Sequence, residues 1–219
     1  MNLLEDCTLA PLNESLIASC YPFDCGNSDL NEFFSQDSIK YSSELLGKTY
    51  CFTLDSDDKK IITAFTIAND SVKTTNLGSG VKKRVTKNIP RAKTMRSYPA
   101  VLIGRLGVVT GIARSGLGGQ VLNFIKSWFI DGKNKTGCRY IVVDAYNEDI
   151  PLAFYTKNGF DFLFNTEKEE KEFLKIKSEE KLNTRFMYFD LILLYRDRIL
   201  SMNSEVDVKS SPEDIAKSA

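Results

Sequence analysis

A hydrophobic run followed by glycines could bind an anion near the middle of the chain. The run from Ala100 to Val109 is rich in Val, Leu and Ile and lies between Pro99 and Gly111, which predicts a buried central strand. Apolar residues at helical spacing then predict a helix that begins near Gly116. The first N–H groups of a helix lack partners within it, and the helix dipole adds partial positive charge there. A pyrophosphate would suit this turn, although glycines at a helix start also form plain tight turns.

The glycine spacing excludes two familiar phosphate-binding loops. The chain has no G-x-x-x-x-G-K-[ST] segment, and Gly116-Leu117-Gly118 lacks the third glycine of a dinucleotide-binding fingerprint. Gly118 and Gly119 have no side chains that would block a ligand, and Arg114 adds a cation at the edge of the turn. The diphosphate of coenzyme A remains a suitable ligand.

The side-chain inventory excludes several classes of enzyme. The chain contains no histidine, which argues against Ser-His and Cys-His hydrolases and against most metalloenzymes. Its cysteines are scattered without C-x-x-C spacing and are Cys7, Cys20, Cys25, Cys51 and Cys138. We expect reduced thiols rather than disulfides or metal ligands, and we predict no metal site.

Length and composition predict one domain. A chain of 219 residues with 42% hydrophobic content can bury a full core, so we assign residues 1–200 to a single domain and 201–219 to a polar tail. The first residues do not resemble a secretion signal, and no apolar run approaches the roughly 20 residues that span a bilayer. The sequence therefore predicts a cytoplasmic protein without a membrane segment.

Charge is balanced overall but unevenly distributed. The stretch from Ser71 to Ala100 carries no acidic residue, and its basic residues are Lys73, Lys82, Lys83, Arg84, Lys87, Arg91, Lys93 and Arg96. With its glycines and prolines and no sustained periodicity, the segment 70–100 is expected to be a long basic connection. It could steer an anionic partner such as tRNA, or be only a solvated cationic loop. The mixed Glu and Lys residues from Glu167 to Lys181 predict a solvated helix face.

The remaining elements alternate between strands and helices. Asn27 is expected to cap a helix through Leu30, and Thr49–Leu54 and Lys60–Ala68 are expected to form a hairpin. Further strands are predicted at Cys7–Leu12, Tyr140–Ala145, Phe160–Phe164 and Arg185–Leu191, and further helices at Ile39–Leu46 and Asp149–Lys157.

Three segments carry a resemblance to one family. RLGVVTGIARSGLGGQVL, at Arg105–Leu122, resembles the acetyl-CoA-binding strand, turn and helix of the GNAT N-acetyltransferases. Asp144-Ala145-Tyr146-Asn147, followed by AFYTKNGF at Ala153–Phe160, is similar to the family's later strand, helix and closing segment. At the front, FDCGNSDLNEFF at Phe23–Phe34 resembles a subgroup that includes acetyltransferase toxins of bacterial toxin and antitoxin pairs.

The resemblance implies an α/β (α+β) GNAT fold and a binding site for acetyl-CoA. The family has a central mixed sheet of six to seven strands, flanked by helices, in which two parallel strands splay apart around the pantetheine arm. By resemblance, Leu106, Gly107 and Val108 offer backbone groups to that arm, and Asn147 bonds it through its side chain. The residues expected to wrap the pyrophosphate are Ala113, Arg114, Ser115, Gly116, Leu117, Gly118 and Gly119. Ala113 departs from the family, which usually has Gln or Arg there.

The resemblance also implies direct attack of an amine on the thioester, with Tyr155 as general acid. A phenol has an ordinary pKa near about 10 and therefore keeps its proton at neutral pH. Outside this motif, Tyr155 would read as a core tyrosine on a helix. Asp144 or Glu148 could relay a proton from the amine, although acidic residues near a helix start are more often caps. An acyl-cysteine route is disfavoured, because Cys138 is the one cysteine assigned to the cofactor-binding segments, and it precedes a strand and is expected to be buried.

Three functions remain open from the sequence. The first is acetylation of a small-molecule or peptide amine, and the second is acetylation of aminoacyl-tRNA, as the toxin subgroup implies. The third is a non-catalytic acyl-CoA-binding or interaction module, which the departure at Ala113 leaves room for. The family resemblance further implies a homodimer and an antitoxin as partners.

Overall fold

A seven-stranded mixed sheet forms the centre of the computed structural model, which describes residues 1–90, 95–113 and 115–209, with side chains as far as residue 200. The strand order is β1-β2-β3-β4-β5-β7-β6, and only β4 and β5 pair in parallel. The strands are β1 (Cys7–Pro11), β2 (Lys48–Leu54), β3 (Asp57–Lys73), β4 (Ser97–Val108), β5 (Tyr140–Tyr146), β6 (Asp161–Phe162) and β7 (Thr184–Asp190). This confirms the predicted mixed sheet.

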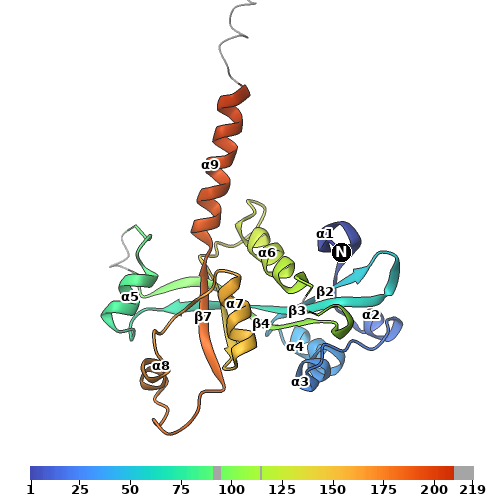
Figure 1. Ribbon diagram of the computed structural model, residues 1–219, viewed down its shortest axis with the longest axis horizontal. Coiled ribbons are helices and arrows are strands. Elements are labelled where there is room, and N and C mark those ends of the chain that lie inside the picture. Colours follow the sequence, from blue (N-terminus) through green and yellow to red (C-terminus); the bar gives the residue numbers. More distant parts are fainter. Residues whose placement is uncertain (91–94, 114, 210–219) are drawn as a thin grey trace, which may run out of the picture.

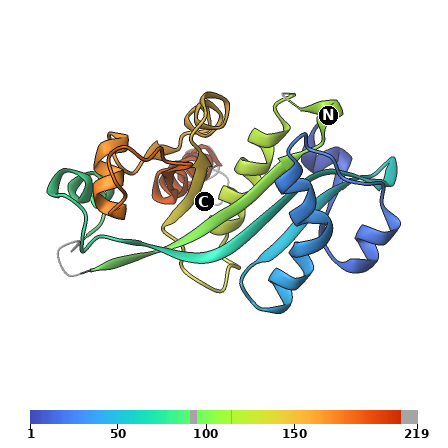
Figure 2. The same cartoon turned by 90° about the horizontal axis from the view of Figure 1, so that it is seen from below.

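Helices cover both faces of the sheet (Figures 1 and 2). They are α1 (Leu3–Asp6), α2 (Glu14–Ser19), α3 (Ser28–Glu32), α4 (Ser38–Ser43), α5 (Ser79–Val85), α6 (Leu117–Ile130), α7 (Asp149–Lys157), α8 (Glu167–Leu174) and α9 (Leu191–Lys209). Helices α6 and α7 pack on one face against the largest apolar cluster, which includes Phe65 and Val143. A second cluster joins helices α2, α3 and α4 to strands β2 and β3. A third cluster joins helix α5 to strands β4, β5 and β7.

The side chains of β5 alternate between the two faces of the sheet and so contribute to two different clusters. Ile141, Val143 and Ala145 of β5 belong to the α6 and α7 cluster, whereas Tyr140 and Val142 belong to the α5 cluster. Successive side chains of a strand point to opposite faces, so α5 lies on the face opposite α6 and α7. The sheet therefore has a double-sided core.

The basic segment is more ordered than the sequence predicted. The predicted connection at 70–100 is partly wrong, because β3 and β4 pair as far as Lys73 and Ser97 and the segment contains α5. Val81 and Val85 of α5 are buried against Tyr140, whose hydroxyl donates to the Val85 carbonyl over 2.7 Å. These contacts join residues far apart in sequence, which local periodicity could not reveal. Figure 2 shows the long β3–β4 pair running to the α5 end.

Two basic residues of that segment, Arg91 and Lys93, lie outside the described residues. At the C-terminal end, α9 extends through Lys209, so the first part of the predicted polar tail is helical. Figure 1 shows α9 projecting from the body of the protein.

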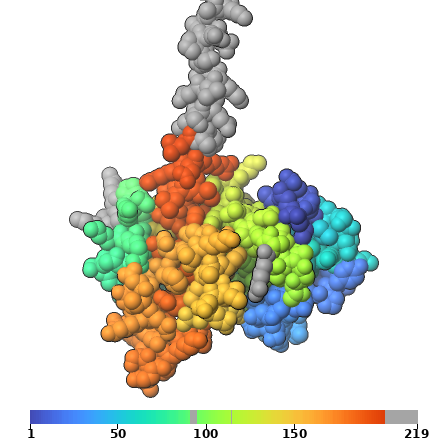
Figure 3. Space-filling view, in the orientation of Figure 1, coloured from blue at the N-terminus to red at the C-terminus, as the bar shows by residue number. Residues whose placement is uncertain are grey.

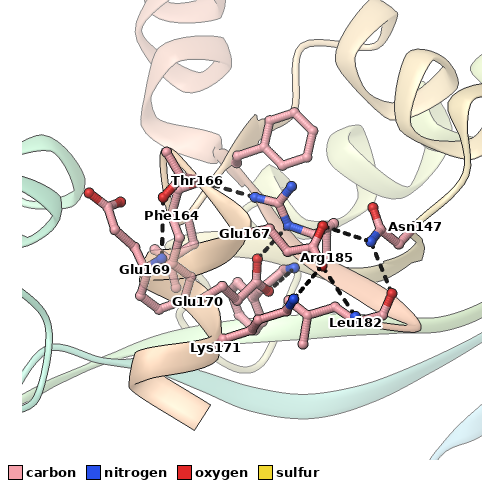
Figure 4. Close-up of polar contacts among 12 residues, drawn as sticks. Asn147, Phe164, Thr166, Glu167, Glu169, Glu170, Lys171, Leu182 and Arg185 are labelled. Atoms are coloured by element: carbon pink, nitrogen blue, oxygen red, sulfur yellow. Dashed lines mark hydrogen bonds and ion pairs between the residues drawn. The ribbon is translucent and has the colours of Figure 1, made fainter. Parts of the chain in front are cut away.

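Helix α8 buries one acidic residue that was expected on a solvated face. Glu170 is 2% exposed and pairs with Arg185 of β7 over 2.6 Å, and its second oxygen accepts from the Phe186 N–H over 2.7 Å. Figure 4 shows this contact between the helix and the strand. Glu167 and Lys171 form a partly exposed pair at 3.2 Å, nearer to the solvated face that was expected. Which acidic residue of α8 is buried depends on the position of β7, and the sequence of the helix alone does not give that position.

We expect Glu170→Ala to destabilise the fold by about 3–5 kcal/mol, because it leaves the Arg185 cation buried without its partner. The matched control is Lys171→Ala on the same helix, which should change stability by at most about 1 kcal/mol. Urea unfolding of both variants measures the difference. Equal stabilities for the two variants would contradict the structural role of Glu170.

Candidate active site

Strands β4 and β5 separate after a short parallel ladder. Three pairs join them, and the last is Leu102 with Val142. Beyond this point β4 stays paired with β3 as far as Val108, and β5 stays paired with β7 as far as Tyr146. The edges that the two strands turn toward each other therefore carry backbone groups with no ladder partner in the described strands.

A β-bulge lies where the separation begins. Arg105 pairs with Thr66 and Ile103 pairs with Ile67, so Gly104 is the extra residue of β4. A bulge bends its strand and increases the local twist. It therefore accounts for the divergence of β4 from β5, and the sequence reasoning missed Gly104 because a lone glycine within a strand is its only signal.

The predicted pantetheine-binding residues lie on this separated edge. Leu106, Gly107 and Val108 form the last part of β4, beyond the final pair with β5. Their positions agree with the prediction that their backbone groups face a ligand between the strands. The ligand contacts themselves stay a prediction.

The glycine turn connects this edge directly to α6. Gly116 caps the helix with φ +90°, a left-handed conformation that favours glycine, and no side chain caps the helix start. The Ala113 and Ser115 N–H groups make local turn bonds of 3.2 and 3.3 Å. The first N–H groups of α6, from Leu117 on, have no acceptor within the helix. A glycine turn therefore leads into α6 where the sequence predicted it, and its binding of an anion stays a prediction. Arg114 lies outside the described residues.

Two of the predicted glycines also permit close packing of α6 on α7. A Cβ at Gly118 would lie 3.0 Å from the Phe154 ring, and one at Gly119 would lie 2.9 Å from the Asn158 Oδ1 atom. Figure 3 shows the surfaces of α6 and α7 side by side on one face of the protein. These glycines thus have a packing role that the sequence did not reveal.

Tyr155 of α7 packs in the same apolar cluster as Leu106 and Val108. Its half-buried ring lies 5.1 Å from the ring centroid of Phe154 and 5.4 Å from that of Phe160. Burial raises the pKa of the Tyr155 phenol above its ordinary value. Within the described residues, the Tyr155 hydroxyl has no hydrogen-bond partner, so it can donate to a ligand.

The N-terminal motif at Phe23–Phe34 packs against Gly107 on the separated edge of β4. A Cβ at Gly107 would lie 3.2 Å from the Cys25 Cβ and Sγ atoms and from the Phe23 ring. The loop is held by the Thr110 N–H, which donates to the Asp24 carbonyl over 2.9 Å. The sequence resemblance included this motif but did not predict its contact with Gly107.

Cys25 was not among the predicted site residues, yet it contacts the candidate site. Burial is the main cause that raises the pKa of its thiol. A protonated thiol is a poor nucleophile, so its position does not favour an acyl-cysteine route. The thiol of Cys138, the cysteine near the matched motifs, also has its pKa raised, to about 11, chiefly by burial.

The face opposite α6 and α7 brings polar residues to the end of β5. The Tyr146 hydroxyl donates to the Asp29 Oδ2 atom of α3 over 3.3 Å. Arg105 of β4 stacks over the Phe33 ring at 3.8 Å. Desolvation, followed by the negative charges of nearby acidic residues, raises the pKa of Asp144 on β5.

Asn147 is directed toward α8 and the loop before β7. Its Nδ2 atom donates to the Leu182 carbonyl over 2.9 Å and to Glu167 over 3.3 Å (Figure 4). Its backbone N–H donates to the Asn183 carbonyl over 2.9 Å. Asn147 therefore supports the loop before β7. Its predicted bond to a pantetheine arm stays a prediction, and the Oδ1 atom of its side chain would have to make it.

The described part of the chain contains no cluster of three or more His, Cys, Asp or Glu residues that could hold a metal ion. None of the helices at 1–90, 95–113 or 115–209 combines the length and apolar character needed to cross a bilayer.

The fold is similar to the known structures of AtaT and KacT, while no protein-family model matches the chain. The structure of AtaT complexed with acetyl-methionyl-tRNAfMet has a TM-score of 0.63 and 19% identity, and the match covers 86% of this chain and 97% of that one. A tyrosine-to-phenylalanine mutant of KacT gives a TM-score of 0.66, 17% identity and coverage of 88% and 99%. AtaTR bound with AcCoA gives 0.62, 20% identity and coverage of 87% and 99%. The chain therefore has the GNAT fold that its motifs predicted.

Proposed function

We propose that the protein is an acetyl-CoA-dependent N-acetyltransferase that acts on a primary amine. The observation that carries this proposal is the separation of two parallel strands where β4 leads through a glycine turn into the uncapped start of α6. Tyr155 of the neighbouring helix α7 packs in the same apolar cluster as Leu106 and Val108 of β4. Similar folds hold AcCoA in AtaTR and a tRNA acetylated on its aminoacyl group in AtaT.

The free N–H groups at the start of α6 would bind the pyrophosphate of acetyl-CoA. Gly116, Leu117 and Gly118 lie at the positive end of the helix dipole, where anions are stabilised. The unpaired edge at Leu106–Val108 would bond the pantetheine amides. Because Ala113 offers only its backbone, main-chain donors would make most of the contacts, with the Arg114 cation predicted at the edge of the turn.

Tyr155 would act as the general acid. The amine nitrogen forms a bond to the acetyl carbon, the carbon–sulfur bond breaks, and the Tyr155 phenol gives its proton to the sulfur. The proton released by the amine passes to solvent, and the Tyr155 phenolate takes a proton back from solvent before the next turnover. Because the pKa of this phenol is raised, it stays protonated at neutral pH and can serve this role.

We expect wild-type protein to bind acetyl-CoA in a calorimetric titration, and Gly116→Glu to weaken binding by about tenfold or more, because it places negative charge at the helix start. Gly116→Ala reports the backbone strain at φ +90° separately. Gly132→Glu is the matched charge control, since no atom lies within 4 Å of a Cβ there. Absence of binding by the wild type would refute the function and favour a non-catalytic interaction module.

Tyr155→Phe should lower kcat by about 10² to 10⁴-fold and leave acetyl-CoA affinity unchanged, because only the proton donor is removed. Thiol release with a panel of amines measures the rate, and calorimetry measures the affinity. A variant with wild-type kcat would remove Tyr155 from the mechanism and leave the cofactor site standing.

An aminoacyl-tRNA is the second candidate acceptor, favoured by the basic surface of α5. Lys83 is exposed and Lys82 half-exposed, and no acidic residue occurs from Ser71 to Ala100. Arg84 contributes less to this basic surface, because its guanidinium donates to the Asn165 side chain and to the carbonyls of Phe162 and Leu163. The AtaT complex contains a charged tRNA, which supports the same acceptor class here. A protein partner, comparable to AtaR bound to AtaT, stays a prediction.

If tRNA is the acceptor, replacing Lys82 and Lys83 with Ala should weaken tRNA binding at low salt. The slope of log affinity against log salt concentration should become shallower by about 0.7–0.9 for each lost phosphate contact. Filter binding across a salt series measures it, and replacement of the exposed Lys133 and Lys135 is the control. An unchanged slope, or no tRNA binding by the wild type, would leave a small-molecule or peptide amine as acceptor.

A further inference from the structure

A lysine is buried between α6 and the end of α7. Lys126 is 5% exposed, and its Nζ atom donates to the Asn158 carbonyl over 2.6 Å. The same atom lies 3.9 Å from the centroid of the Phe189 ring and 5.4 Å from that of Phe160. No carboxylate of the described residues forms an ion pair with it. The ammonium is thus held by one carbonyl and two aromatic faces.

Such an ammonium is costly to bury. Desolvation lowers the pKa of Lys126 to about 8, which shows that the folded protein disfavours its charged form. A hydrophobic residue of similar length would fill the same space without this penalty. A contribution other than core stability would explain a lysine at this position.

The carbonyl that Lys126 binds belongs to the residue that ends the tyrosine-bearing helix. The Asn158 N–H bonds back to the carbonyls of Phe154 and Tyr155, and its Nδ2 atom bonds the Phe154 carbonyl over 2.8 Å. Its Oδ1 atom lies against Gly119 in the first turn of α6. A cation near a helix C-terminus is favoured by the helix dipole.

The turn after Asn158 also links Lys126 to the end of α7. Gly159 has φ +80°, and a Cβ there would lie 3.2 Å from the Phe189 ring that Lys126 contacts. The Phe160 N–H then donates to the Tyr155 carbonyl over 3.0 Å. Lys126 therefore contacts both ends of the turn that fixes the last residues of α7 relative to α6.

Resting on the proposed acetyltransferase function, we propose that Lys126 is a positioning residue that holds Tyr155 relative to the anion-binding start of α6. The ammonium does not touch a reacting atom. It fixes the distance between the helix that would bind the pyrophosphate and the hydroxyl that would protonate the leaving sulfur. A small displacement of a catalytic group is enough to slow a reaction strongly.

Lys126→Met tests this role, with Lys135→Met, at an exposed site in the loop after α6, as the matched control. Thermal unfolding, acetyl-CoA affinity, kcat and KM are measured for both variants, for Tyr155→Phe and for the Lys126→Met/Tyr155→Phe double variant. Lys126→Gln, which keeps a hydrogen-bond donor without the charge, carries the same comparison if the methionine variant does not fold.

We expect Lys126→Met to keep or raise the unfolding temperature and to keep its KM for acetyl-CoA, yet to lower kcat by about 10- to 100-fold. The double variant should be no slower than Tyr155→Phe, because both changes act through the same hydroxyl. Lys135→Met should match the wild type. An unchanged kcat, or a loss of activity explained by a lower unfolding temperature, would overturn the proposal.

A spectroscopic measurement separates this proposal from the proposed function. The ring-carbon resonance of Tyr155, assigned by its absence in Tyr155→Phe, should shift in Lys126→Met and not in Lys135→Met. If the wild type transfers no acetyl group, the acetyltransferase function fails, but a shifted resonance still supports the positioning contact. An unshifted resonance overturns the positioning role whether or not the protein is an acetyltransferase.

Discussion

The separation of β4 from β5 is the constraint on which the candidate site depends. Each strand keeps its hydrogen bonds on its other side, β4 with β3 and β5 with β7, so the sheet stays intact while the two edges diverge. The bulge at Gly104 bends β4 just after its last pair with β5. Unpaired backbone groups cost free energy when buried, so these edges favour a ligand that can bond to them.

Helices α6 and α7 pack closely beside the candidate site. Gly118 and Gly119 meet two demands, since their N–H groups lie in the free first turn of α6 while their missing Cβ atoms admit Phe154 and Asn158. Tyr155, on the same helix as Phe154 and Asn158, packs in the apolar cluster that includes Leu106 and Val108. In the proposed function, binding of an anion and placement of a proton donor would both depend on this helix–helix contact.

Elements with strong local patterns were predicted closely. Helix α7 has the predicted bounds, Asp149–Lys157, and Asn27 caps α3 by accepting from the Leu30 N–H over 3.1 Å. The basic segment was predicted less well, because α5 is stabilised by burial against Tyr140 rather than by a periodic pattern of its own. The buried charge of Glu170 was missed for the same reason, since its partner lies on β7.

The sequence by itself determined the order of the strands, the glycine turn at a helix start and the family resemblance of the motif around Tyr155. Only the tertiary structure decided that Cys25 lies against Gly107 and that Lys126 is buried beneath the end of α7. The physical reason is that helix caps and apolar spacing depend on near neighbours in the chain. Burial of a charge, or contact with a glycine, depends on distant segments that meet only when the core is packed.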